Sequence, residues 1–175
     1  MIVLVGFMGA GKSTVGPALA ARLGLPFVDT DEVVERSAGL AIADIFEYQG
    51  EAGFRDLEAR VISAELAGPE AVVALGGGAV TTDAVRQALR GHDVVLLDIS
   101  LEDALARVGG DARRPMLRRP DLAEVFAARA RYYAQVATVR VPVAGRSAPE
   151  VVEAVVESLA TRGPSLDPES PDAGE

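Results

Sequence analysis

The sequence predicts an α/β domain built on a parallel sheet, and two observations support this prediction. Short runs rich in Val and Leu recur along the 175-residue chain without polar alternation, as in strands that are buried on both faces. A helix-length segment follows each run, and such alternation is typical of a parallel sheet covered by helices. The expected strands are residues 2–5, 25–28, 71–75, 93–99 and 138–143.

The expected helices are marked by their ends. Residues 12–23 stop at a Gly-x-Pro signal, and residues 50–66 carry apolar side chains at helical spacing before a Gly-Pro pair. Two other expected helices begin at Glu32 and near Leu101. Three more are expected over residues 81–90, 122–136 and 149–160.

Composition indicates one globular domain over residues 1–161. Residues 162–175 form an acidic tail rich in Pro and Ser that is expected to be disordered. The absence of cysteine excludes disulfides and thiolate metal sites. No apolar run approaches the roughly 20 residues that span a bilayer, and no basic segment precedes the first run. We therefore expect no membrane partner and a cytoplasmic location. The net charge of −9 argues against non-specific nucleic-acid binding, although arginines gathered in one cleft can still bind a small anion.

Residues 6–13 match the phosphate-loop pattern G-x-x-x-x-G-K-[ST] between an expected strand and an expected helix. Glycines let the backbone N–H groups of such a loop point at phosphates, and the hydroxyl of Ser13 is suited to Mg²⁺. Lys12 is the only lysine in a chain that has sixteen arginines. A nucleotide phosphate needs a compact cation on a slim stem here, which a guanidinium does not supply.

Two other P-loop classes fit poorly. Small GTPases read their base with an N-K-x-D segment, and the chain has no second lysine. Motor-type ATPases usually carry an acidic pair after an apolar strand. Asp98 follows such a run, but the start of a helix comes directly after it. Asp98 is therefore expected near a strand end or as a helix cap.

Asp29 and Asp31 follow the second apolar run. Ligands of open α/β sheets bind beyond the carboxyl ends of strands, so both carboxylates are expected to face the crevice of the phosphate loop. One would serve a metal and its waters, and the other a substrate hydroxyl. The alternative is that one of them only caps the helix that begins at Glu32.

Arg55 and Glu58 are three residues apart early in an expected helix, so they can pair on one face. A carboxylate that holds an arginine can also aim its fork at a ligand carboxylate. The alternative is an exposed helix pair of little value to stability.

Three successive glycines, Gly76, Gly77 and Gly78, close the third apolar run. Each costs conformational entropy on folding, so three in a row indicate a place where the backbone must come close to a ligand. A flexible loop is the alternative.

The phosphate loop, the D-T-D segment, the F-R-x-x-E helix and the L-G-G-G-A-V turn, in this order and at these intervals, resemble the shikimate kinase family. The resemblance runs from Ile2 to about Ala160. It implies a nucleoside-monophosphate-kinase-like P-loop fold, with three α/β/α layers, a five-stranded parallel sheet and a short lid over about residues 110–122. It also implies transfer of the γ-phosphoryl of ATP to the 3-hydroxyl of shikimate in aromatic amino-acid biosynthesis, by a monomer.

The resemblance further implies a role for each matching residue. Lys12, Asp31 and Arg114 would be catalytic, with Asp31 as the proton acceptor and Arg114 closing from the lid. Ser13 and Asp29 would serve Mg²⁺, Asp29 through water. The implied ATP contacts are Gly9, Ala10, Gly11, Lys12, Ser13, Thr14, Arg107, Arg114 and Arg146. The implied shikimate contacts are Asp31, Arg55, Gly76, Gly77, Gly78 and Arg129.

One departure concerns the spacing after the lid. Arg114 and Arg129 are 15 positions apart, a few residues fewer than the family usually has. Arg131 is therefore the second candidate for the substrate carboxylate.

Two other functions compete with this interpretation. One is a different small P-loop kinase, acting on gluconate or on a nucleotide, and the other is a nucleotide-binding regulatory protein without turnover. The paired aspartates and the Arg55 and glycine motifs argue against the first, because they suit a hydroxylated carboxylic acid. Intact Lys12 and Asp31 argue against the second.

Overall fold

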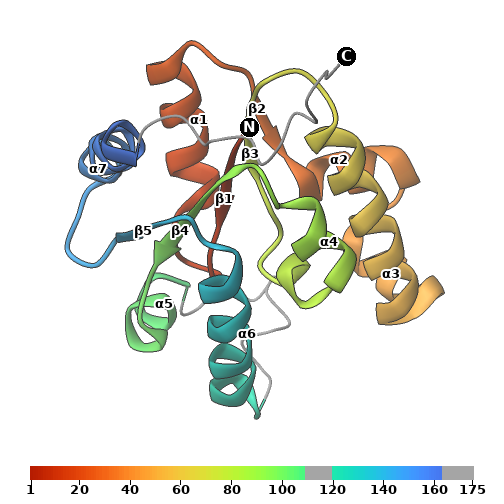
Figure 1. The fold of residues 1–175 in the computed structure, drawn as a ribbon. Coiled ribbons are helices and arrows are strands. Elements are labelled where there is room, and N and C mark those ends of the chain that lie inside the picture. The colour runs from red at the N-terminus through yellow and green to blue at the C-terminus, as the bar shows by residue number, and fades with distance from the viewer. Residues whose placement is uncertain (109–119, 163–175) are drawn as a thin grey trace, which may run out of the picture.

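The structure is a computed structural model that describes residues 1–108 and 120–162. Its centre is a five-stranded sheet in the order β2-β3-β1-β4-β5, and every neighbouring pair is parallel (Figure 1). The predicted fold class and sheet are confirmed. The strands are β1 (Ile2–Val5), β2 (Phe27–Asp29), β3 (Val72–Ala74), β4 (Asp93–Asp98) and β5 (Val139–Pro142).

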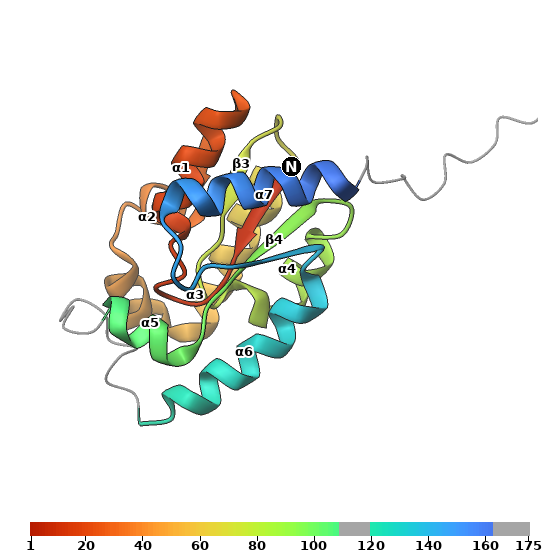
Figure 2. The same cartoon turned by 90° about the vertical axis from the view of Figure 1, so that its left-hand side faces the viewer.

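Helices cover both faces of the sheet. In Figures 1 and 2, α1 and α7 lie side by side on one face, while α4, α6 and the second half of α3 cover the other. The predicted three layers are therefore present. The helices are α1 (Lys12–Leu23), α2 (Thr30–Ala38), α3 (Ile42–Leu66), α4 (Asp83–Ala88), α5 (Leu101–Val108), α6 (Leu122–Val136) and α7 (Ala148–Arg162), with a 3-10 turn η1 (Ala79–Thr81) before α4.

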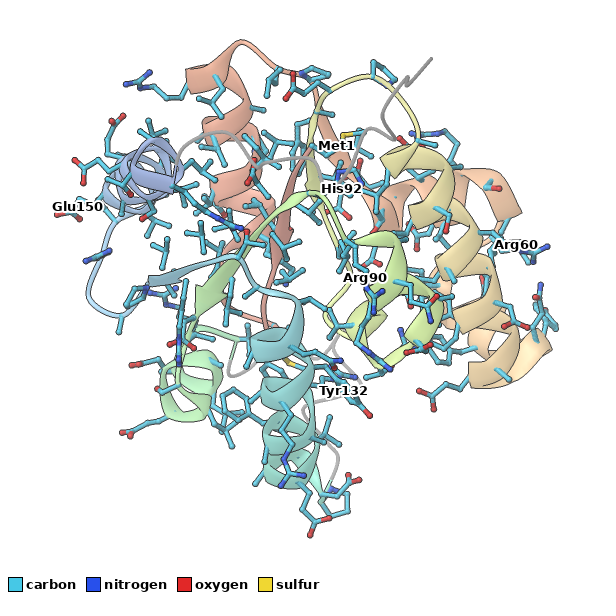
Figure 3. All side chains as sticks on the ribbon, viewed as in Figure 1. Met1, Arg60, Arg90, His92, Tyr132 and Glu150 are labelled. Carbon is cyan, nitrogen blue, oxygen red and sulfur yellow. The ribbon has the colours of Figure 1, made fainter. Side chains whose placement is uncertain are left out.

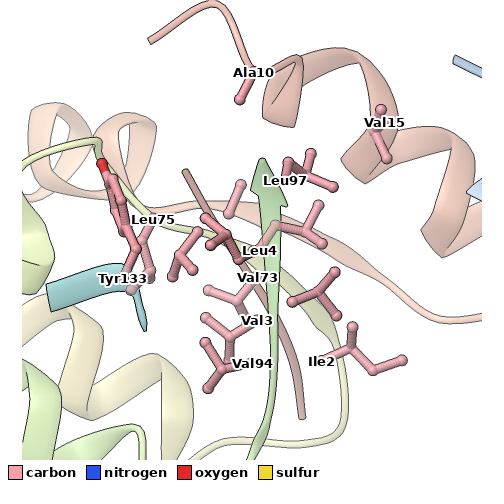
Figure 4. Packing of buried hydrophobic residues seen from close by; sticks show 14 of the residues in the cluster. Ile2, Val3, Leu4, Ala10, Val15, Val73, Leu75, Val94, Leu97 and Tyr133 are labelled. Atoms are coloured by element: carbon pink, nitrogen blue, oxygen red, sulfur yellow. The ribbon is translucent and has the colours of Figure 1, made fainter. Parts of the chain in front are cut away.

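The central strands are buried on both faces, which explains why their sequences do not alternate. All four residues of β1 are buried, and Figure 4 shows Val3 and Leu4 packed beside Val73 of β3 and Val94 of β4. Gly16 of α1 lets β2 approach, because a Cβ there would lie 2.9 Å from Cζ of Phe27. Branched aliphatic side chains thus fix the sheet from which the site loops emerge.

The predicted helix over residues 50–66 is confirmed as the second half of a longer element. The structure has one long element, α3, that begins at Ile42 and bends at Gly50, whose φ of 69° and ψ of −179° are not helical. Phe46, before the bend, stacks on Phe54, after it, with ring centroids 4.5 Å apart. Gly50 therefore marks the predicted helix boundary, and the helical segment over residues 42–49 before it was not predicted.

Other boundaries differ by a few residues. The predicted helix over residues 81–90 is divided between η1 and α4, and the strand expected over 25–28 is shifted to Phe27–Asp29. The predicted lid over residues 110–122 lies mostly outside the described residues, as does the tail beyond Arg162. Within the ranges that the structure describes, no helix is both long and apolar enough to cross a membrane.

Candidate active site

A cavity of about 780 Å³ opens where the phosphate loop, the start of α2 and the segment after β3 meet. All fifteen of the predicted site residues that lie in the described ranges line it. They are Gly9, Ala10, Gly11, Lys12, Ser13, Thr14, Asp29, Asp31, Arg55, Gly76, Gly77, Gly78, Arg107, Arg129 and Arg146. Arg114 lies outside the described residues. Motifs that are far apart in the sequence therefore meet at one cavity.

The phosphate loop is shaped by glycines with positive φ. Gly9 and Gly11 have φ of 79° and 95°, and a Cβ on Gly6 would lie 2.6 Å from the carbonyl oxygen of Leu97. The Nζ of Lys12 donates to the carbonyl oxygen of Gly6 at 2.7 Å, so the ammonium lies over the loop. No acidic residue stands in the first turn of α1, which leaves its positive N-terminal end available to an anion.

Asp29 and Asp31 hold different positions at the end of β2. Oδ1 of Asp29 accepts a hydrogen bond from the backbone N–H of Asp31 at 3.0 Å and caps α2. Asp29 therefore caps α2 and also lines the cavity, so capping is not its only contact with the site. Burial raises the pKa of Asp31, and the charge of Asp29 raises it further, while Lys12 and Arg55 oppose the shift. A carboxylate of raised pKa is a stronger proton acceptor.

Arg55 and Glu58 form an ion pair at the cavity wall. Nη1 of Arg55 lies 2.6 Å from Oε2 of Glu58, and the side chains are only 17% and 1% exposed, so the exposed-pair alternative was wrong. Burial raises the pKa of Glu58, and Arg55 opposes that shift. The Nε of Arg55 is buried and has no hydrogen-bond partner within residues 1–108 and 120–162. One part of the guanidinium is therefore fixed by Glu58, and the Nε is left as a donor.

The glycine segment after β3 admits these side chains. A Cβ on Gly76 would lie 2.5 Å from Oδ1 of Asp31 and 2.9 Å from Oε1 of Glu58, and one on Gly78 would lie 2.7 Å from Cζ of Arg55. Close approach was the predicted reason for the glycines. The structure adds that the approaching groups include the protein's own charged side chains.

Arg129 reaches the cavity from α6. A Cβ on Gly77 would lie 3.8 Å from its Nη1, and its guanidinium lies over the ring of Phe7 in the phosphate loop, 5.8 Å from the centroid. Arg131, two positions later, is exposed and does not line the cavity. The geometry therefore favours Arg129 over the second candidate.

Comparison with known proteins agrees with this geometry. A family model described as shikimate kinase matches residues 8–160. A shikimate kinase of Mycobacterium marinum is 44% identical over 98% of this chain and 96% of its own length, and one of Mycobacterium tuberculosis is 46% identical over 93% and 95%. The chain belongs to the shikimate kinase family. The predicted family and the predicted enzyme class, a kinase acting on shikimate, are confirmed.

Solved structures of the family superpose closely on this fold. The shikimate kinase from Acinetobacter baumannii in complex with shikimate gives a TM-score of 0.87 at 35% identity and covers 93% of both chains. The enzyme from Aquifex aeolicus gives 0.83 at 35% identity, covering 92% of this chain and 96% of its own. A gluconokinase from Sinorhizobium meliloti gives only 0.58 at 23% identity, which shows the shared fold alone. Family membership argues against both competing functions.

The two arginines expected near the nucleotide behave differently. Arg107 of α5 donates to the carbonyl oxygen of Val143 at 2.7 Å and to that of Gly9 at 3.3 Å, so it ties the phosphate loop to the segment after β5. Arg146 is exposed at the cavity rim.

Asp98 ends β4 and pairs with Arg140 of β5 at 2.8 Å, which confirms its expected place at a strand end.

Sequence reasoning assigned no role to two residues that hold the site. The hydroxyl of Thr30, fully buried, donates to the carbonyl oxygen of Ala74 at 3.2 Å and accepts from the N–H of Gly76 at 3.4 Å. The hydroxyl of Tyr133 donates to the carbonyl oxygen of Gly77 at 2.6 Å. For Tyr133 a signal existed, because it stands four residues after Arg129 and hence on the same helix face.

Proposed function

We propose that this protein transfers the γ-phosphoryl of ATP to the 3-hydroxyl of shikimate, giving shikimate 3-phosphate and ADP. The observation that carries the proposal is the shared cavity. Lys12 of the phosphate loop, the base candidate Asp31 and the arginines Arg55 and Arg129 line one space at the carboxyl edge of the sheet. Phosphoryl transfer depends mainly on positioning and charge neutralisation, and this arrangement supplies both.

The phosphate loop and Lys12 hold the triphosphate. Backbone N–H groups of residues 9–14 and the N-terminus of α1 bind the phosphate oxygens, and the Lys12 ammonium neutralises charge on the transferred group. Arg107 and Arg146 stand on the nucleotide side of the cavity. Arg114, from the predicted lid, would reach the phosphates when the lid closes and expels water.

The residues present fit Mg²⁺. Ser13 and Asp29 line the cavity beside the loop, and they offer a hydroxyl and a carboxylate oxygen. Mg²⁺ takes oxygen ligands and keeps several waters, so two protein groups and the phosphates suffice to hold it. The ion would neutralise phosphate charge. We assign Ser13 as a direct ligand and Asp29 as a contact through water.

Shikimate lies on the other side of the cavity. Arg55, held by Glu58, and Arg129 bind its carboxylate with directional hydrogen bonds, while the glycine segment lies against the ring. The 3-hydroxyl oxygen attacks the γ-phosphorus, the bond from that phosphorus to the β-bridging oxygen breaks, and ADP leaves. Asp31 accepts the hydroxyl proton. We further propose that the protein acts as a cytoplasmic monomer with one domain over residues 1–161.

An ADP-release assay with shikimate, gluconate, nucleoside monophosphates and no acceptor tests the proposal. Turnover with shikimate alone is expected, and phosphorus NMR of the product should locate the phosphate on the 3-hydroxyl. Turnover with another acceptor and not with shikimate would overturn it.

The variant Lys12→Arg tests the phosphate end separately. It should lose most activity, at least about a hundredfold, because a guanidinium cannot replace the compact ammonium at the transferred group. Near-normal turnover would contradict the role given to the single lysine.

A further inference from the structure

The glycine segment after β3 is held through its carbonyl groups. Gly76 O accepts from the N–H of Ala79 at 3.1 Å, and Gly78 O accepts from the hydroxyl of Thr81 at 2.7 Å. Gly77 O accepts from the hydroxyl of Tyr133 at 2.6 Å. Two of these donors follow directly in the chain, whereas Tyr133 comes from α6, 56 positions away. Tyr133 is therefore the tertiary anchor of this segment.

The N–H groups of the same segment are largely left for a ligand. The N–H of Gly76 donates to the hydroxyl of Thr30, but the N–H groups of Gly77 and Gly78 have no acceptor within residues 1–108 and 120–162. All three glycines line the cavity. Because an unpaired backbone N–H near the interior is costly, two of them beside a cavity indicate donors kept for a bound molecule.

Tyr133 is built into the core for this contact. Its side chain is 5% exposed, and Figure 4 shows its ring beside Leu75 with the hydroxyl oxygen at the segment that follows. Burial raises the pKa of Tyr133, so the hydroxyl keeps its proton and remains a donor. A phenylalanine would fill the same volume and would lose only the hydrogen bond.

Arg129 lies beside the same glycine segment. Arg129 stands one helical turn before Tyr133, and its Nη1 is 3.8 Å from the position of a Cβ on Gly77. Phe126, one turn earlier again, packs edge-on against Phe7 of the phosphate loop with centroids 4.9 Å apart. One face of α6 therefore meets the phosphate loop and the glycine segment together.

We propose that Tyr133 is a positioning residue for the acceptor. Its hydroxyl holds the Gly77 carbonyl so that the N–H groups of Gly77 and Gly78 and the guanidinium of Arg129 present a fixed set of donors to a hydroxylated carboxylic acid. The proposal rests on the proposed function, since it names how that function's acceptor is oriented.

The test compares Tyr133→Phe with Tyr132→Phe. Tyr132, labelled in Figure 3, lies next to Tyr133 on α6, and Arg86 of α4 stacks on its ring at 4.5 Å. Its hydroxyl has no hydrogen-bond partner within the two described ranges. Tyr132→Phe keeps the ring and serves as the matched control.

We expect Tyr133→Phe to raise the KM for shikimate about three- to tenfold, the effect of one lost hydrogen bond, while the KM for ATP changes less than about twofold. Tyr132→Phe should leave both constants unchanged. Equal changes in the two KM values, or a lowered Tm with unchanged KM values, would overturn the proposal, because a merely structural hydroxyl gives those results.

A second variant covers the case in which Tyr133→Phe does not fold. Genetic incorporation of 3-fluorotyrosine at position 133 keeps the donor and should keep a near-normal KM for shikimate; a rise equal to that of phenylalanine would contradict the proposal. Failure of the wild-type protein to phosphorylate shikimate would instead overturn the proposed function, so the two failures are distinguishable.

Discussion

Replacing Glu58 with glutamine tests how the carboxylate-binding arginine is held. Arg55 and Glu58 are paired at 2.6 Å with the glutamate side chain 1% exposed. Glu51, a second carboxylate that pairs with Arg55, lies 3.7 Å away and is 68% exposed. A hydrogen bond to a charged group contributes about 1.5–3 kcal/mol, and a neutral one contributes about 1 kcal/mol. Glutamine keeps a hydrogen bond of the neutral kind, so the interaction that orients Arg55 is weakened by about 0.5–2 kcal/mol.

That loss corresponds to about a two- to thirtyfold lower kcat/KM for shikimate, since 1.4 kcal/mol is a factor of ten. The Tm should change little. Burial raises the pKa of Glu58 in the folded protein. The free energy of unfolding therefore falls as pH rises through that pKa, because the buried carboxyl group ionises. At pH 7 the variant loses the ion pair but also escapes this cost, and the two effects oppose each other.

Asp83→Asn is the matched control. Asp83 also pairs with an arginine three residues later in a helix, Arg86, at 2.9 Å, but its side chain is 70% exposed. Arg86 additionally donates to the carbonyl oxygens of Val80 and Thr81. We expect less than a twofold change in kcat/KM. Steady-state assays with each substrate varied and thermal melts of both variants decide the matter. Equal losses in the two variants, or an equal rise in the KM for ATP, would refute the reasoning.

Three further predictions concern the same cavity. Arg129→Ala should raise the KM for shikimate at least about tenfold and Arg131→Ala less than twofold, because only the first lines the cavity; equal effects in steady-state kinetics would contradict the assignment. Kcat/KM should fall as pH drops through the raised pKa of Asp31. In Asp29→Asn this fall should occur at lower pH, because the charge of Asp29 contributes to the raised pKa. An unchanged acid side of the pH–rate profile would exclude Asp31 as the base. Gly76→Ala should lower kcat at least about tenfold, because its Cβ would lie 2.5 Å from a carboxylate oxygen of Asp31; wild-type kcat in the same assay would show that the segment can yield.

The sequence was most informative where local pattern and burial agree. The central strands β1, β3 and β4 were found because both of their faces are covered, so their apolar runs do not alternate, whereas β5 alternates buried and exposed residues. The phosphate loop was found because its spacing is required by the turn itself. The boundary at Gly50 was predicted because a glycine interrupts the helical pattern there, but the helical segment over residues 42–49 before it was not predicted.

The rest of the site depends on distant packing. The burial of Glu58 could not be predicted, since it is produced by the glycine segment 18 or more positions later in the chain. The choice between Arg129 and Arg131 depended on which face of α6 meets the sheet. Tyr133 stands four residues after Arg129, a spacing that puts both on one face of α6, but nothing in the sequence shows that its hydroxyl donates to the Gly77 carbonyl.

The strand order has a consequence for how acceptor preference can change. With β1 in the middle, the acceptor groups Asp31, Arg55 and Gly76–78 come from the β2–β3 half, while Arg107 and Arg146 come from the β4–β5 half. Preference for a new acceptor could therefore evolve, or be engineered, through substitutions within residues 30–78 alone, while the ATP-binding half stays unchanged. Arg129 is the exception, because it reaches the acceptor side from α6, which precedes β5 in the chain. An enzyme changed only within residues 30–78 would therefore keep an affinity for carboxylates unless Arg129 were replaced as well.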